Sequence, residues 1–288
     1  MNFEFYPWLR DLSSPEAREA LEGARQTYLD VGAVTLPNFV TPQALETMAA
    51  QARAAEDDAF TTDSTHTAYL TNVDLERFDK ASVFNHAMRT QVASTAFDEL
   101  PPHSPLAALY RHDTLLQLVS WIVTGKFDQL FLSADPLGAC SINVFRPNYH
   151  HSFHFDESVF STTLMLQEAS EADSGLFQYT PPLRANKSNL ALTEVAAAIQ
   201  AYDKETPIPA PFAEIDQHHQ DKNHDQPPLL RTLDFSAGTL SIFSGSRSLH
   251  RVTRVRGTRS RLVAVLTYGT QPGFCNSGKW DTLEWQAS

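Results

Sequence analysis

The feature of this sequence that most constrains its fold is a change in the pattern of residues at about Gly138. From there on, short β-rich runs are separated by turn residues. Short strands at this spacing predict a β-sandwich or jelly roll rather than alternating β/α units. The expected strands run from Ala139 to Phe145, Val159 to Leu166, Leu176 to Tyr179, Gly238 to Phe243, His250 to Val255 and Leu262 to Tyr268.

The residues before this β-rich part predict a mainly helical portion. Good helix formers with an apolar stripe indicate the first helix, and Thr41 followed by Pro42 marks the start of the second. Helices are expected over Pro15 to Tyr28, from Thr41 to near Glu56, and from Asp113 to Gly125, with one short strand over Ala33 to Leu36.

A block from about 184 to 230 interrupts the β-rich part. It holds one expected helix, Leu192 to Tyr202, followed by a polar stretch with proline and histidine, so we interpret it as an insertion between two strands. We therefore expect one domain of the α+β class with a mainly β core. Its parts are a helical portion at 1–137 packed on a jelly-roll core at 138–272, and a C-terminal tail at 273–288.

Bulk composition limits the environment and the partners of the chain. A formal net charge of −12 repels phosphate backbones and disfavours nucleic acid as a partner. No apolar run is long enough to span a bilayer, and the N-terminus lacks the pattern of a signal peptide. Cys140 and Cys275 cannot make a disulfide framework, which favours the cytoplasm. We expect a small-molecule partner, with monomer and homodimer both open.

A histidine and an aspartate two positions apart, His154 and Asp156, are the strongest candidates for chemistry. In an extended strand both would face one cavity, while Phe153 and Phe155 would face away. His250, which follows an apolar strand and a turn, offers a second imidazole. Two imidazoles and one carboxylate form the facial triad of non-haem iron(II), which leaves positions open for a co-substrate and O₂.

Two arginines, Arg259 and Arg261, follow His250 and lie two positions apart. A guanidinium offers parallel donors to a carboxylate, which suits the distal carboxylate of 2-oxoglutarate. Arg261 abuts the apolar run from Leu262 to Leu266, whereas Arg259 lies nearer to the turn. Either arginine therefore remains a candidate, with Arg261 favoured.

Taken in order, these residues resemble the 2-oxoglutarate/iron(II) oxygenase superfamily over about residues 138–272. The likeness consists of His-x-Asp, a distal histidine, and a basic residue about ten positions further on. The resemblance implies a double-stranded β-helix core and a dioxygenase that uses iron(II), 2-oxoglutarate and O₂ to hydroxylate an aliphatic C–H bond. It also implies the metal ligands and catalytic residues His154, Asp156 and His250, a 2-oxoglutarate clamp at Arg261 or Arg259, and a co-substrate contact at Asn143.

Three further segments are similar to a family of radical halogenases and hydroxylases that act on free amino acids. They are His66-Thr-Ala-Tyr-Leu70, Leu249-His250-Arg-Val-Thr253 and the ending Leu-Thr-Tyr268-Gly-Thr-Gln-Pro-Gly273. Halogenases of this kind carry Gly or Ala in place of the carboxylate ligand, which opens a site for chloride. Because this chain keeps Asp156, the resemblance implies hydroxylation of a free amino acid or a close derivative rather than halogenation.

Substrate contacts are expected from polar residues near the metal ligands and from the helical portion. Each candidate also has a simpler interpretation as a packed or solvent-exposed side chain. Glu157 in particular points to the opposite face of an ideal strand from Asp156. The candidates are His66, Tyr69, Tyr149, His150, His151, Glu157 and Trp285, together with Trp280.

Two alternative functions stay open. One is a cupin-like metal oxygenase or isomerase that does not use 2-oxoglutarate, which an inward arginine clamp disfavours. The other is a jelly-roll protein that binds a ligand without catalysis, which a complete set of three metal ligands disfavours.

Overall fold

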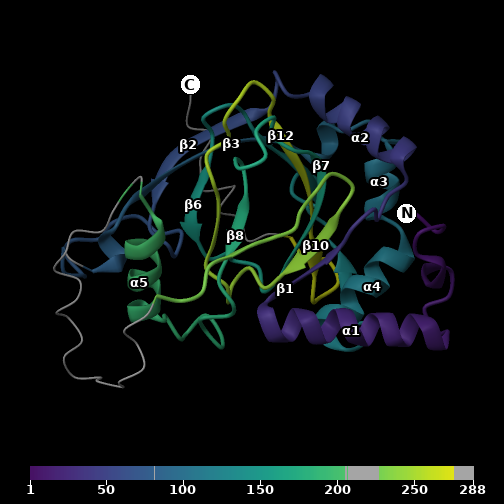
Figure 1. Cartoon of the computed structure of the whole chain (residues 1–288), viewed down its shortest axis with the longest axis horizontal. Coiled ribbons are helices and arrows are strands. Elements are labelled where there is room, and N and C mark those ends of the chain that lie inside the picture. The colour runs from purple at the N-terminus through teal and green to yellow at the C-terminus, as the bar shows by residue number, and fades with distance from the viewer. Residues whose placement is uncertain (81, 205, 207–226, 276–288) are drawn as a thin grey trace.

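The computed structural model describes residues 1–80, 82–204, 206 and 227–275. Their strands form two main sheets in which every neighbouring pair is antiparallel (Figure 1). The major sheet contains, in order, β1 (Ala33–Leu36), β10 (Leu240–Phe243), β7 (Ser161–Gln167), β12 (Arg261–Leu266), β5 (Cys140–Phe145), β3 (Met88–Thr95) and β2 (Phe60–His66). The minor sheet contains β6 (His151–His154), β11 (His250–Val252), β8 (Phe177–Tyr179) and β9 (Arg231–Thr232), and a separate ladder joins β4 (Phe131–Leu132) to β13 (Tyr268–Gly269).

The strands from β5 to β12 pass back and forth between the two sheets. The major sheet takes β5, β7, β10 and β12, and the minor sheet takes β6, β8, β9 and β11. This alternation is the arrangement of a jelly roll. The prediction of a mixed α+β architecture built on antiparallel sheet is therefore confirmed.

The strand predictions for the core hold to within a few residues, but the portion at 1–137 is less helical than expected. It supplies β2 and β3 to the major sheet in addition to β1. β2 lies at the edge of the sheet and exposes most of its side chains, so its sequence lacks the alternation of apolar and polar residues that predicts a strand.

Four helices cover the outer face of the major sheet (Figure 1). They are α1 (Pro15–Val31), α2 (Pro42–Ala54), α3 (Pro105–Tyr110) and α4 (Asp113–Thr124), with short 3₁₀ turns at Pro7–Arg10, Val83–Asn85 and Phe97–Glu99. Ser14 caps α1 by accepting a hydrogen bond from the Ala17 amide, and Gly125 ends α4 in the left-handed conformation. Leu118 of α4 packs in one apolar cluster with Ile142 and Leu262 of the sheet.

The insertion expected at 184–230 contains α5 at Leu192–Tyr202, as predicted. Val195 and Ile199 of this helix pack with Phe153 and Phe155 on the outer face of the minor sheet. The remainder of the insertion at 207–226, and the tail from 276 onward with Trp280 and Trp285, lie outside the described residues. In the described part, none of the helices combines the length and apolar character needed to cross a membrane.

A third apolar cluster fills the space between the two sheets. Phe145 and Phe243 come from the major sheet, and Phe177 and Val252 come from the minor sheet. These side chains lie next to the candidate metal ligands, because the ring of His250 is centred 5.4 Å from that of Phe177 and 5.1 Å from that of Phe243. The jelly roll therefore surrounds the candidate site with packed aromatic side chains.

Candidate metal centre

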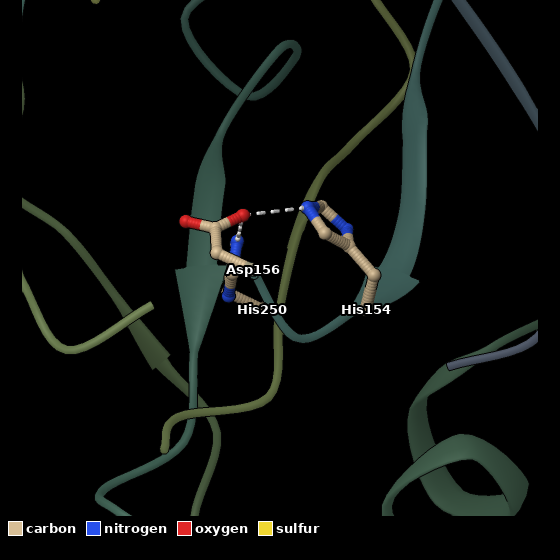
Figure 2. Close-up of side chains that lie close together, drawn as sticks. All are labelled: His154, Asp156 and His250. Atoms are coloured by element: carbon tan, nitrogen blue, oxygen red, sulfur yellow. Dashed lines mark ion pairs between the residues drawn. The ribbon is translucent and has the colours of Figure 1, made fainter. Parts of the chain in front are cut away.

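The three candidate ligands come together between β6 and β11. His154 ends β6 and pairs in register with His250, which begins β11. Asp156 was expected to face the site through strand alternation, but it lies two residues beyond the end of β6 and is placed by the loop. Its backbone amide donates a hydrogen bond to the Gly245 carbonyl at 3.0 Å. One ligand atom from each residue lies within 4.8 Å of the others (Figure 2).

The two imidazoles are oriented in the same way by the backbone. The Nδ1 of His154 donates to the Ser152 carbonyl at 2.7 Å, and the Nδ1 of His250 donates to the Ser248 carbonyl at 2.9 Å. A carbonyl can only accept, so Nδ1 carries the proton in each ring. Each Nε2 therefore faces the site, 3.4 Å and 3.2 Å from the same carboxylate oxygen, Oδ1 of Asp156 (Figure 2).

The second carboxylate oxygen of Asp156 is held away from the two imidazoles. Oδ2 accepts a hydrogen bond of 2.5 Å from the Ser161 hydroxyl. Gly245 lies against the same oxygen so closely that a Cβ on this glycine would stand 2.3 Å from Oδ2. Oδ1 is thus the oxygen that the site presents to a metal ion.

The protonation states suit metal binding. Burial lowers the pKa of His154 to about 4, so its imidazole is neutral at pH 7 and Nε2 has a free lone pair. Burial alone would raise the pKa of the Asp156 carboxyl, but the adjacent His250 and His154 outweigh burial and hold it well below its usual range. A divalent cation requires a neutral imidazole and an ionised carboxylate in this way.

Two further histidines line the same site. The register between β6 and β11 shifts by a bulge, because His250 pairs with His154 whereas Val252 pairs with His151. The bulge turns His151 to the face of His154, and the two rings stack with their centres 3.7 Å apart. His66 completes the group, with its ring centred 5.6 Å from His151 and 6.0 Å from His154. Burial lowers the pKa of both His66 and His151.

The structure separates the two arginine candidates. Arg261 begins β12 and is only 2% exposed, and its guanidinium carbon lies 5.3 Å from the centre of the Phe145 ring. Its Nε has no hydrogen-bond partner among the described residues. Arg259 is exposed and donates to the carbonyls of Glu168 and Ala169. Arg261 is therefore the arginine that is buried and available to a ligand.

A small pocket lies against Arg261, lined in part by Gly175, Phe177 and Phe235. Phe177 also stacks on His250, so the pocket adjoins the candidate metal ligands. Asn143 pairs with Val263 of β12, two positions from Arg261, and its Oδ1 accepts a hydrogen bond from Ser94. Asn143 therefore lies on the same sheet face as the arginine.

The other expected substrate residues lie in different surroundings. Tyr69 stacks on Phe84 and Phe155, and its hydroxyl donates to the Leu190 carbonyl. Tyr149 packs against the cluster between the sheets, and Glu157 is exposed beyond the end of β6. His150 is buried, and its backbone pairs with Gln91 of β3.

Sequence reasoning missed two residues that hold Asp156 in place, Ser161 and Gly245. Gly245 lies just after a predicted strand, where a glycine indicates only a turn. Ser161 starts β7, and nothing in its sequence context indicates that it faces a carboxylate.

The chain is similar to known proteins in its structure and not in its sequence. No family model matches the chain, and no curated protein matches it. The non-haem α-ketoglutarate-dependent epimerase SnoN from nogalamycin biosynthesis has a similar structure, with a TM-score of 0.53 at 12% identity over 88% of this chain and 83% of SnoN. HygX from Streptomyces hygroscopicus, solved with nickel, 2-oxoglutarate and hygromycin B, gives a TM-score of 0.51 at 12% identity over 86% of each chain. The chain thus has the fold of the 2-oxoglutarate/iron(II) oxygenases.

Proposed function

We propose that this protein is an iron(II)- and 2-oxoglutarate-dependent dioxygenase that hydroxylates an aliphatic C–H bond of a small polar substrate. The observation that carries the proposal is the convergence of two imidazole nitrogens and one carboxylate oxygen on a single point (Figure 2). This ligand set on one side of a metal ion suits iron(II) and leaves further positions open.

The residues around that point fit the metal. His154 and His250 have their Nδ1 protons engaged by carbonyls, which is the outer-shell arrangement that orients metal-bound histidines. When bound, iron(II) with 2-oxoglutarate and O₂ supplies the oxidising chemistry that converts C–H to C–OH, with succinate and CO₂ as the other products. The protein supplies the ligands, the orientation of the reactants and a shielded site.

Arg261 is the residue that we assign to the distal carboxylate of 2-oxoglutarate. Its guanidinium is buried, its Nε has no partner among the described residues, and its pocket reaches Phe177 beside His250. A desolvated guanidinium binds a carboxylate through short, charge-assisted hydrogen bonds. The structures of HygX and of SnoN in complex with Fe³⁺ and α-ketoglutarate show that proteins of this fold hold this type of co-substrate.

We propose a free amino acid or a close derivative as the substrate, and hydroxylation as the outcome. The substrate class is supported by the resemblance of the His66–Leu70, Leu249–Thr253 and 266–273 segments to amino-acid halogenases and hydroxylases. Hydroxylation is supported by Asp156, a carboxylate at the position that halogenases leave open for chloride. His151, which stacks on His154, and His66, whose ring lies edge-on to His154, are the side chains that we place next to this substrate.

The test is succinate formation from 2-oxoglutarate with iron(II) and ascorbate, across a panel of free amino acids. We expect one amino acid to raise succinate formation and to yield a product heavier by one oxygen, and we expect Asp156→Ala to abolish both. Oxygen consumption without any need for 2-oxoglutarate would instead indicate the cupin-like alternative. Metal binding without oxygen consumption would indicate a ligand-binding protein.

A further inference from the structure

A buried threonine of β3, Thr90, links the candidate metal ligand His154 to His66. Thr90 is only 3% exposed. Its hydroxyl oxygen accepts a hydrogen bond from the Ser152 amide at 3.1 Å and lies 2.6 Å from Nε2 of His66. The carbonyl of the same serine orients His154, because it accepts from Nδ1 of that ring at 2.7 Å. Thr90 therefore holds the residue whose carbonyl fixes a candidate metal ligand.

The direction of each hydrogen bond around Thr90 follows from its partners. Nδ1 of His66 lies 2.9 Å from the Thr67 carbonyl, which can only accept, so Nδ1 carries the proton. Burial lowers the pKa of His66, so Nε2 of the neutral ring is an acceptor and the Thr90 hydroxyl donates to it. The single proton of this hydroxyl is thus used by His66, and a lone pair is used by the Ser152 amide. Both ring nitrogens of His66 are likewise engaged, and the ring is held in one orientation.

Thr90 lies where β3 of the major sheet meets β6 of the minor sheet. A backbone bridge between Gln91 and His150 joins the two strands. Beyond this bridge, two hydroxyl groups replace the backbone ladder. The Thr90 oxygen accepts from the Ser152 amide, and the Ser152 hydroxyl donates to the Arg89 carbonyl. The strand that carries the metal ligand is therefore positioned against β3 by side chains, and loss of the Thr90 hydroxyl would leave a buried amide without its partner.

A second buried threonine of the same strand makes no such link. Thr95 is 2% exposed, and its hydroxyl has no hydrogen-bond partner among the described residues. It pairs with Ile142 of β5, whose side chain packs in the cluster under the helices. Because directly paired residues share a face of the sheet, Thr95 lies on the face away from the metal ligands. The two threonines therefore separate the effect of a bonded hydroxyl from the effect of a threonine in β3.

We propose that Thr90 is a positioning residue of the metal centre, whose hydroxyl fixes His154 through Ser152 and holds His66 beside it. The inference rests on the metal site of the proposed function and adds to it a residue that does not touch the metal. Without the hydroxyl, the Ser152 amide and Nε2 of His66 both lose a partner. New partners for these buried groups require a shift of β6 or of the His66 ring, whose centre lies 6.0 Å from that of His154. Either shift changes the surroundings of the metal ligand.

The experiment compares Thr90→Val with Thr90→Ser and with Thr95→Val. Valine keeps the branched shape and favours strands but lacks the hydroxyl, whereas serine keeps the hydroxyl. We expect Thr90→Val to raise the dissociation constant for manganese(II) or cobalt(II) about 10-fold, at the lower end of the range for lost outer-shell partners. The absorption spectrum of cobalt(II)-loaded Thr90→Val should also change, because it depends on the geometry of the ligands. Thr90→Ser and Thr95→Val should keep the affinity and the spectrum of the wild type.

Wild-type affinity and an unchanged cobalt(II) spectrum in folded Thr90→Val would show that the proposal is wrong. A loss of affinity in Thr90→Ser or in Thr95→Val as large as that in Thr90→Val would also overturn it, since neither change removes the bonded hydroxyl. Thr90→Ala removes the same hydroxyl and decides the matter where Thr90→Val does not fold. If Asp156→Ala binds metal as the wild type does, the proposed metal centre itself is wrong. Binding that is lost in Asp156→Ala but kept in Thr90→Val and Thr90→Ala contradicts only the role of Thr90.

Discussion

Replacing Gly245 by alanine tests directly how tightly the carboxylate ligand is held. The new methyl group would stand 2.3 Å from Oδ2 of Asp156 and 2.7 Å from its Cβ. Contacts below 3.0 Å do not persist, so the carboxylate must retreat by about 0.7 Å or the turn must shift. Since Oδ2 is also bonded to Ser161, neither movement leaves Oδ1 where it faces both imidazoles.

The expected loss of metal affinity follows from how little a metal ligand can move before binding weakens. Ligands must be held to within about 0.5 Å of their productive position, and loss of an outer-shell support weakens metal affinity about 10- to 100-fold. We therefore expect the dissociation constant of Gly245→Ala for manganese(II) or cobalt(II) to rise by that factor, measured anaerobically by competition with a chromophoric chelator. The overpacked turn should also cost about 1–3 kcal/mol of stability in the metal-free protein.

The same chemical change at Gly23 is the control. This glycine lies in the exposed interior of α1, and a Cβ there meets nothing within 4 Å. Gly23→Ala should stabilise the protein by up to about 1 kcal/mol through helix propensity and leave metal affinity unchanged. If Gly245→Ala is folded and binds metal as the wild type does, then the close approach of this glycine does not position Asp156 and the reasoning fails.

Four further outcomes are expected. Ser161→Ala should weaken metal binding about 10-fold by removing the donor to the carboxylate, while the melting temperature of the metal-free protein changes little. Arg261→Gln should abolish stabilisation by 2-oxoglutarate in the presence of zinc(II), whereas Arg259→Gln should preserve it, because Arg259 bonds only to carbonyls on the surface. In the native protein a thiol reagent at pH 8 should label Cys275 and not Cys140, which burial shields and whose pKa burial raises to about 12. The Cys140 thiol of the folded state therefore keeps a proton that the thiol of the unfolded chain loses near pH 9. The contribution of Cys140 to the free energy of unfolding should fall as the pH rises from about 9 toward 12. Urea titrations of wild type and Cys140→Ala at several pH values measure this fall.

The parts of the fold that were predictable are those where one side of a strand or helix is buried. Ile142 and Val144 of β5, for example, alternate with more polar neighbours because one face of the major sheet packs on the helices. β2 was not predictable, since an exposed edge strand needs no apolar period. Hydrogen bonds to β3 over its whole length hold it in the sheet instead.

The candidate ligands could be named from the sequence because His154, Asp156 and His250 are chemically distinctive side chains. The choice between Arg259 and Arg261 could not be made, since it depends on which of them the chain buries after the turn. His151 was expected near the metal ligands, but the way in which it reaches them could not be predicted. A bulge in β6 turns this side chain to the opposite face of the strand, and nothing in a short polar sequence indicates where a bulge will form.

The orientation of the two imidazoles depends on backbone atoms rather than on neighbouring side chains. Each ring is fixed by the carbonyl two residues before it, at Ser152 and at Ser248. A carbonyl is supplied by any residue, so these side chains can change while the Nδ1–H donors and the Nε2 lone pairs keep their directions. Gly245 has no such freedom, because only a missing side chain makes room for Asp156. Among the residues that support the candidate metal centre, Gly245 is therefore the one at which a substitution should be tolerated least.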